Sequence, residues 1–216
     1  MISLQLAADQ ISGVLRLAFT PAGELADGDP AAQSGVRQSV DDFFASFWAI
    51  VFALPFFAIG VLAARRTILA TPALAEAAPL AAAHPVFYLA VNVVGFVIDW
   101  ALSIVGIAAI ARASDVSGKI ASAIICYNWA QVLTTAIQAV PTMLIGIFGA
   151  ALGLLSLPAL AVSIFILWAI FRKALGASVS TTIAILILLI AITLASNAVV
   201  AGAATWALQA LYPSAG

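Results

Sequence analysis

Charged residues are scarce in this chain. Lysine and arginine number 8 and aspartate and glutamate 9 among 216 residues, so charged side chains make up 8% of the sequence. Hydrophobic residues make up 65%, and the mean hydropathy is +1.19. A water-soluble domain of this composition would expose large apolar patches. The composition therefore predicts an integral membrane protein, and the net charge of -1 provides no basic stripe for nucleic acid.

Residues that carry catalysis, metal binding or redox chemistry are equally scarce. Cys126 is the single cysteine, so one chain can form no disulfide. His84 is the single histidine, and it precedes Pro85 in an expected loop, whereas haem ligands are generally buried within the bilayer. The HExxH, GxSxG and phosphate-binding glycine motifs do not occur. We therefore expect no enzymatic activity, no cofactor and no metal site.

Long apolar segments make up most of the sequence. A helix needs about 20 apolar residues to cross a hydrocarbon core of roughly 30 Å, so the chain has room for five crossings. We expect these spans at about residues 43–64, 86–111, 119–140, 155–172 and 178–202. The expected fold class is all-α: a polytopic membrane helical bundle of about five transmembrane helices with an N-terminal interfacial amphipathic helix.

Two connections within the transmembrane part are expected to be irregular. The first span closes on Arg65 and Arg66, and residues 67–85 contain too many prolines to cross the bilayer. Residues 120–171 contain no charged residue, yet this length suits two crossings better than one. Glycines and prolines therefore predict a turn or a broken helix within residues 141–158.

The N-terminal part divides into two segments. Residues 1–20 have the amphipathic pattern of a helix that lies on the membrane surface. Residues 21–42 are rich in acidic residues, glycine and proline and are expected to form a polar linker, which leaves 43–216 as the transmembrane domain. The expected apolar face of the first segment consists of Leu4, Ala7, Ile11, Val14, Leu15 and Ala18.

The basic residues predict an orientation. With five spans, one side of the membrane receives Arg16, Arg37, Arg112, Lys119, Arg172 and Lys173. The other side receives only Arg65 and Arg66. Because cytoplasmic loops carry an excess of lysine and arginine, we expect a cytoplasmic N terminus and a C terminus outside.

Polar residues align on the second and third spans. Asn92, Asp99 and Ser103 recur at helical spacing on the second span. Asp99 is the only ionisable group well inside a span, so it must be neutral, paired or hydrated. The matching residues of the third span are Asn128, Gln131, Thr135 and Gln138. If the two spans form a tight hairpin, their polar faces meet and the amides shelter Asp99.

This polar seam has two interpretations. Amide and hydroxyl side chains hydrogen-bond between membrane helices, so the seam could serve only to hold the two spans together. Alternatively, it lines a polar path or a small-molecule pocket in which Asp99 binds a cation or a proton. Both interpretations stay open from the sequence.

A family resemblance accompanies this pattern. The five-span plan with a polar arm, and the hairpin from Ile98-Asp99-Trp100 through Lys119 to Tyr127-Asn128-Trp129, resemble bacterial membrane proteins of the Yip-domain type over residues 86–205. Eukaryotic members organise vesicle membranes and contact small GTPases through their cytoplasmic arm. The arm here is short and lacks their Gly-Pro signature, so this activity is not carried over.

We therefore expect a non-enzymatic bacterial inner-membrane protein. It would act as a scaffold or accessory subunit, and its partners would be the lipid bilayer and other membrane proteins or a second copy of the chain. Two alternatives remain. One is a small transporter or channel that uses the seam around Asp99, and the other is an accessory subunit of a bioenergetic complex whose cofactors are held by other chains.

Overall fold

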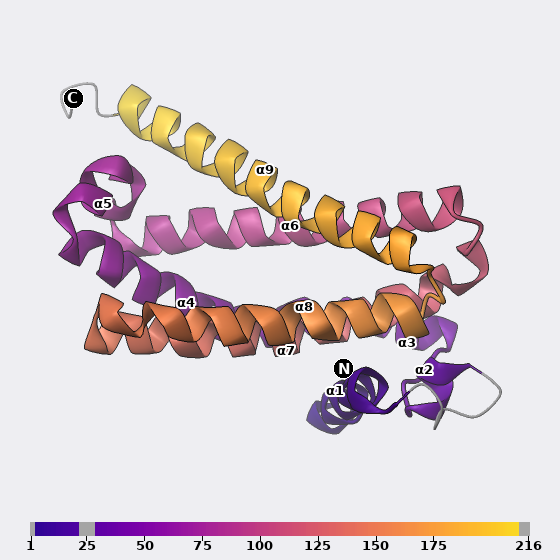
Figure 1. The fold of residues 1–216 in the computed structure, drawn as a ribbon. Coiled ribbons are helices and arrows are strands. Elements are labelled where there is room, and N and C mark those ends of the chain that lie inside the picture. Colours follow the sequence, from indigo (N-terminus) through magenta and orange to yellow (C-terminus); the bar gives the residue numbers. More distant parts are fainter. Residues whose placement is uncertain (1–2, 22–28, 212–216) are drawn as a thin grey trace.

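Helices form all the regular structure in the residues that the computed structural model describes, which are 3–21 and 29–211 (Figure 1). Five helical segments are long and apolar enough to cross a membrane: Val40–Ala70, Pro85–Ala113, Ser117–Phe148, Ala151–Lys173 and Val179–Ala210. The predicted fold class, an all-α bundle of about five transmembrane helices, is confirmed.

The long helices form two layers. Helices α4 (Ala49–Ala70), α7 (Ile120–Phe148) and α8 (Ser156–Lys173) form one layer, and α6 (Pro85–Ala113) and α9 (Val179–Leu211) pair to form the other. The layers meet at one end, called the packed end here, where α6 leads into α7 and α8 leads into α9 (Figure 1). Toward the opposite end, called the open end, α9 diverges from α8 (Figure 1).

Small residues explain the helix pairs. A Cβ atom at Gly106 of α6 would lie 2.9 Å from Leu188 Cδ2 of α9, so a larger residue would require the Leu188 side chain to move. A Cβ atom at Gly146 of α7 would likewise lie 3.0 Å from the carbonyl oxygen of Ala63 in α4. Without a hydrophobic driving force between helices in lipid, such close approach is a main source of association.

The predicted hairpin of the second and third spans is not closely packed. Helix α6 packs chiefly against α9, and α7 packs chiefly against α4 and α8. The sequence pattern placed the polar residues of α6 opposite α7, whereas Gly95 and Gly106 of α6 face α9. Trp100 of α6 still donates to Asn128 of α7 at 2.8 Å, but the two polar faces do not form a packed seam along their length.

The N-terminal segment packs on the packed end of the bundle. Helix α1 (Leu4–Phe19) lies against α7 and α8, and the short α2 (Pro30–Gln33) and α3 (Val40–Ser46) follow it. Ala7, Val14 and Ala18 of the predicted apolar face are buried, but Leu4 is 78% exposed and Leu15 is also exposed. Gln10, Gly13 and Leu17 are buried instead, so the packed face is rotated from the prediction.

Several predicted boundaries differ from the structure. Helix α4 continues past Arg65 and Arg66, and α5 (Pro72–Ala77) and the 3-10 turn η1 (Pro79–Ala82) occupy the expected loop. A second 3-10 turn, η2 (Ser117–Lys119), precedes α7. The predicted linker contains α2 and the start of α3, and its residues 22–28 lie outside the described part.

The expected break between the third and fourth spans lies later than Pro141. That proline is inside α7, which continues to Phe148, because membrane helices tolerate proline where neighbouring helices support the backbone. The chain reverses at Gly149, whose φ of +96° is a conformation that glycine adopts readily. The 3-10 turn η3 (Ala150–Leu155) then leads into α8.

Candidate functional site

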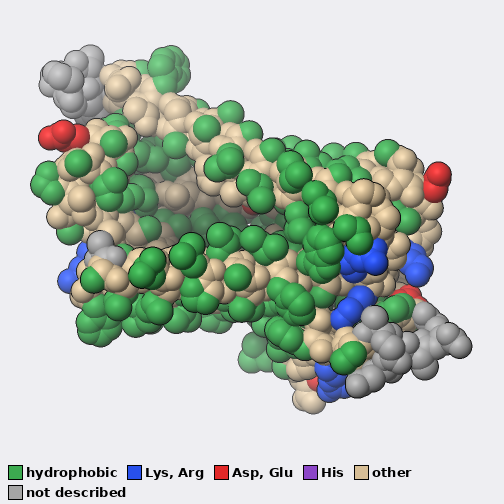
Figure 2. Space-filling model, viewed as in Figure 1, with side chains coloured by type: hydrophobic (Ala, Val, Ile, Leu, Met, Phe, Trp, Pro, Cys, Tyr) green, Lys and Arg blue, Asp and Glu red, His purple; other side chains and the backbone are tan. Residues whose placement is uncertain are grey.

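A cleft of about 690 Å³ lies between the two layers. Residues of α4, α6, α7, α8 and α9 line it, and Figure 2 shows the hollow between the layers. Pockets of about 300–1,000 Å³ are typical of small-molecule sites. The polar residues that line the cleft are Asp99, Ser103, Tyr127, Gln131, Thr134, Thr135, Gln138, Thr142, Ser163 and Thr193.

A buried hydrogen-bond network beside the cleft joins α6, α7 and α3. Trp100 Nε1 of α6 donates to Asn128 Oδ1 of α7 at 2.8 Å, and Asn128 Nδ2 donates to Ser46 Oγ of α3 at 2.9 Å. The Ser46 hydroxyl in turn donates to the carbonyl oxygen of Phe43. All three side chains are buried, so the network joins three helices within the core.

Aromatic residues close the rear of the cleft. The rings of Phe57 in α4 and Phe96 in α6 are stacked with centroids 4.3 Å apart. Trp100 packs edge-on against Phe96 at 5.5 Å. Access to the cleft therefore comes from the side between α8 and α9 and from the open end (Figure 2).

Asp99 contributes the one acidic group among the described residues that line the cleft. It lies midway along α6, and the Ser196 hydroxyl of α9 donates to its Oδ1 at 3.3 Å. The Thr193 hydroxyl of the same helix also lies against the carboxyl group. The partners of Asp99 are thus hydroxyls of α9, whereas the sequence suggested amides of the third span.

The α7 wall carries a row of amides and hydroxyls. Gln138 Nε2 donates to Ser163 Oγ of α8 at 3.1 Å, which joins two helices within the cleft wall. Gln131 donates to the Tyr127 hydroxyl one turn earlier and accepts from Thr134. These side chains give the cleft neutral hydrogen-bonding groups opposite Asp99.

The structure separates the seven predicted seam residues into three groups. Five of them line the cleft: Asp99, Ser103, Gln131, Thr135 and Gln138. Asn128 belongs to the buried network. Asn92 Nδ2 donates to the carbonyl oxygen of Tyr88 in its own helix, and Asn92 does not line the cleft.

Sequence reasoning missed the contribution of α8 and α9. Ser163, Thr193 and Ser196 all take part in the site, and the last two are spaced i, i+3 on one helix face. That spacing was a usable signal, but hydroxyl residues are common in membrane helices and identify no partner by themselves.

The single histidine and the single cysteine do not line the cleft. His84 Nδ1 accepts from the backbone N–H of Val86 at the start of α6, and Cys126 is fully buried. No group of three His, Cys, Asp or Glu residues that could hold a metal ion occurs within the described part of the chain.

The fold and the apolar helices define a class: a multi-pass, α-helical membrane protein. No protein-family model, curated protein or solved structure matches the chain. The resemblance to Yip-domain proteins therefore stays a prediction.

Proposed function

We propose that this protein is a small membrane transporter whose substrate binds in the cleft around Asp99. The observation that carries the proposal is the position of the cleft. Polar groups of α6, α7, α8 and α9 converge on one open volume in the middle of membrane-spanning helices. Secondary transporters bind their substrates near the bilayer midplane between groups of helices.

The closed packed end favours a transporter over a channel. A channel requires a continuous path, but Ile107 and Ala111 of α6 and Ala123 of α7 are fully buried at the packed end. Alternating access requires a site that opens to one side at a time, and a cleft closed at one end meets this requirement.

The geometry also weighs against a purely structural seam. Helix-joining polar residues satisfy each other across a packed interface. Trp100 and Asn128 do so, but Asp99 and Thr135 line an open volume. The scaffold and accessory-subunit functions, and location in a bacterial inner membrane, stay predictions from the sequence that copurification from native membranes would test.

Thiol labelling tests whether the cleft contains water. Cys126 is replaced by alanine, and a single cysteine is introduced at Thr135, which lines the cleft, or at Val140, which is 53% exposed on the same helix. A charged methanethiosulfonate reagent reacts with the thiolate, which forms poorly in apolar surroundings. We expect Thr135→Cys to react roughly tenfold faster or more than Val140→Cys in lipid bilayers.

The side of access provides a second readout of the same experiment. In oriented vesicles, a reagent added at the open-end side should modify Thr135→Cys, whereas reagent added at the packed-end side should not. Equal, slow modification of both cysteines would mean that lipid or side chains fill the cleft, and the transporter proposal would be wrong.

A further inference from the structure

Asp99 has no built-in counter-ion. Among the described residues that line the cleft there is no lysine, arginine or histidine. Arg65 follows the lining residue Ala64 directly in the sequence. Its Nη2 atom, however, donates to the carbonyl oxygen of Ala83 at 3.0 Å, outside the cleft lining. Its guanidinium also lies 6.0 Å from the ring centre of Tyr88.

The hydroxyls beside Asp99 cannot replace a positive charge. Ser196 and Thr193 supply hydrogen bonds, but a carboxylate inside a membrane-spanning segment still has to gain a proton or pair with a cation. The amides opposite, such as Gln131 and Gln138, are neutral. Apart from a proton, a bound ligand is therefore the source from which the cleft can gain a compensating positive charge.

The walls of the cleft determine the rest of the ligand. Phe56, Leu160, Ile164, Ile190 and Leu194 line the cleft, and all of them are more than one third exposed. They lie on α4, α8 and α9, and the side opening lies between α8 and α9 (Figure 2). A ligand with an apolar body could enter from the bilayer and keep that body against these side chains.

We infer that the cleft binds an amphipathic, monovalent organic cation, with its positive charge beside Asp99 and its apolar body against the α8 and α9 walls. The inference rests on the proposed function and names its substrate class. A doubly charged or strongly hydrophilic cation does not fit, because one carboxyl group and a largely apolar wall cannot replace its hydration.

Equilibrium binding of two probes to the purified full chain in lipid nanodiscs tests the inference. Tetraphenylphosphonium carries one delocalised positive charge, and triphenylphosphine oxide has a similar apolar body without net charge. We expect saturable binding of the cation and weaker binding of the neutral probe. Asp99→Asn keeps the size and the hydrogen bond from Ser196, and it should weaken cation binding roughly tenfold or more.

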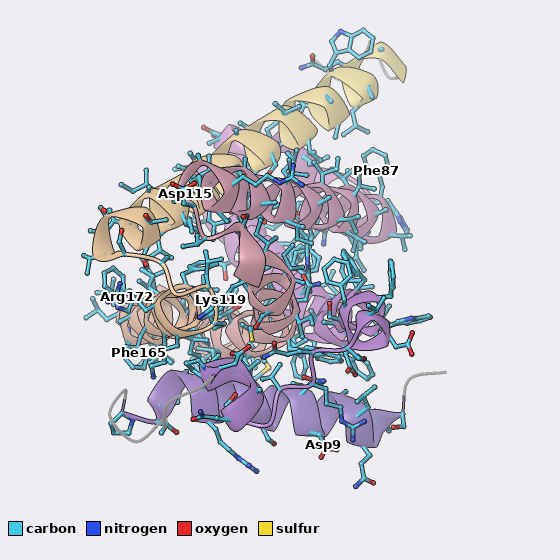
Figure 3. The ribbon with its side chains drawn as sticks, turned by 90° about the vertical axis from the view of Figure 1, so that its right-hand side faces the viewer. Asp9, Phe87, Asp115, Lys119, Phe165 and Arg172 are labelled. Atoms are coloured by element: carbon cyan, nitrogen blue, oxygen red, sulfur yellow. The ribbon has the colours of Figure 1, made fainter. Side chains whose placement is uncertain are left out.

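Asp115→Asn is the matched control. Asp115 lies in the exposed loop between α6 and α7, outside the cleft (Figure 3). Its φ is +56°, a conformation that asparagine tolerates. This variant removes the same charge from the same chain and should bind tetraphenylphosphonium like the original protein.

A third variant separates the two proposals. Ile164→Trp places a larger side chain in the cleft wall and should reduce binding of any ligand there. If both probes bind equally, or Asp99→Asn binds the cation unchanged, while Ile164→Trp reduces binding, the cleft binds small molecules and the cation inference is wrong. If neither probe binds saturably, or Ile164→Trp changes nothing, the cation inference is wrong, and the labelling of Thr135→Cys decides the proposed function separately.

Discussion

Asn128 shows how a polar side chain is accommodated in the core of this bundle. Its amide oxygen accepts from Trp100 and its amide nitrogen donates to Ser46, so one side chain joins α6, α7 and α3. Asn92 lies on the same predicted seam, but its hydrogen-bond partner is Tyr88 of its own helix, through the backbone carbonyl oxygen and the side chain. Two asparagines that look equivalent in the sequence thus have different roles.

Substitution of each asparagine by alanine should reveal this difference. Asn128→Ala leaves the buried indole N–H of Trp100 without its acceptor, which should cost about 1–3 kcal/mol of stability. Asn92→Ala removes hydrogen bonding to Tyr88 within one helix and should cost about 0.5 kcal/mol. Thermal unfolding in detergent measures both. If both variants lose the same stability, the buried network of Trp100, Asn128 and Ser46 does not stabilise the bundle more than a hydrogen bond within one helix does.

At the scale of elements, Lys173 links α8 to the C-terminal end of α1 through hydrogen bonds. Its Nζ, at the end of α8, donates to the carbonyl oxygens of Leu17, Ala18 and Thr20 at 2.7, 3.1 and 2.8 Å. The last carbonyls of a helix lack partners within the helix, and a cation there also interacts favourably with the helix dipole. This contact links two elements that are far apart in the sequence.

Replacement of Lys173 by methionine should loosen α1 selectively. The variant keeps an unbranched apolar side chain but loses three charge-assisted hydrogen bonds. We expect amide hydrogen exchange in residues 4–20 to accelerate roughly tenfold, with little change in α4 or α7. Arg172→Met is the control. Arg172 donates to the carbonyl oxygen of Ala177, five residues further along the chain, and this hydrogen bond does not involve α1. If hydrogen exchange in residues 4–20 accelerates equally in both variants, the hydrogen bonds of Lys173 do not specifically hold α1 in place.

The elements also show what the sequence could and could not predict. Apolar length and basic boundaries were enough to predict five long helices, because the bilayer imposes both. The pairing of α6 with α9 was not predictable from polar spacing, since Gly106 fits against Leu188 in a way that depends on three-dimensional shape. The polar row of α7 was predicted, but the hydroxyls that contact Asp99 come from α9.

At the scale of the whole molecule, the packed end carries most of the basic residues. Lys119 and Arg172 lie at this end, which Figure 3 shows face-on. Arg65 lies toward the open end, near η1. Since basic residues accumulate on the cytoplasmic side, the cleft would then open toward the bilayer and the outside.

Cysteine labelling at the two ends tests this orientation. In a Cys126→Ala background, Glu76→Cys places an exposed thiol in α5 at the open end, and Ser117→Cys places one in the turn η2 at the packed end. A membrane-impermeant maleimide added to intact cells should label Glu76→Cys and leave Ser117→Cys unmodified until the membrane is permeabilised. The reverse pattern would place the packed end outside, and the transporter proposal would then describe a cleft that opens to the cytoplasm.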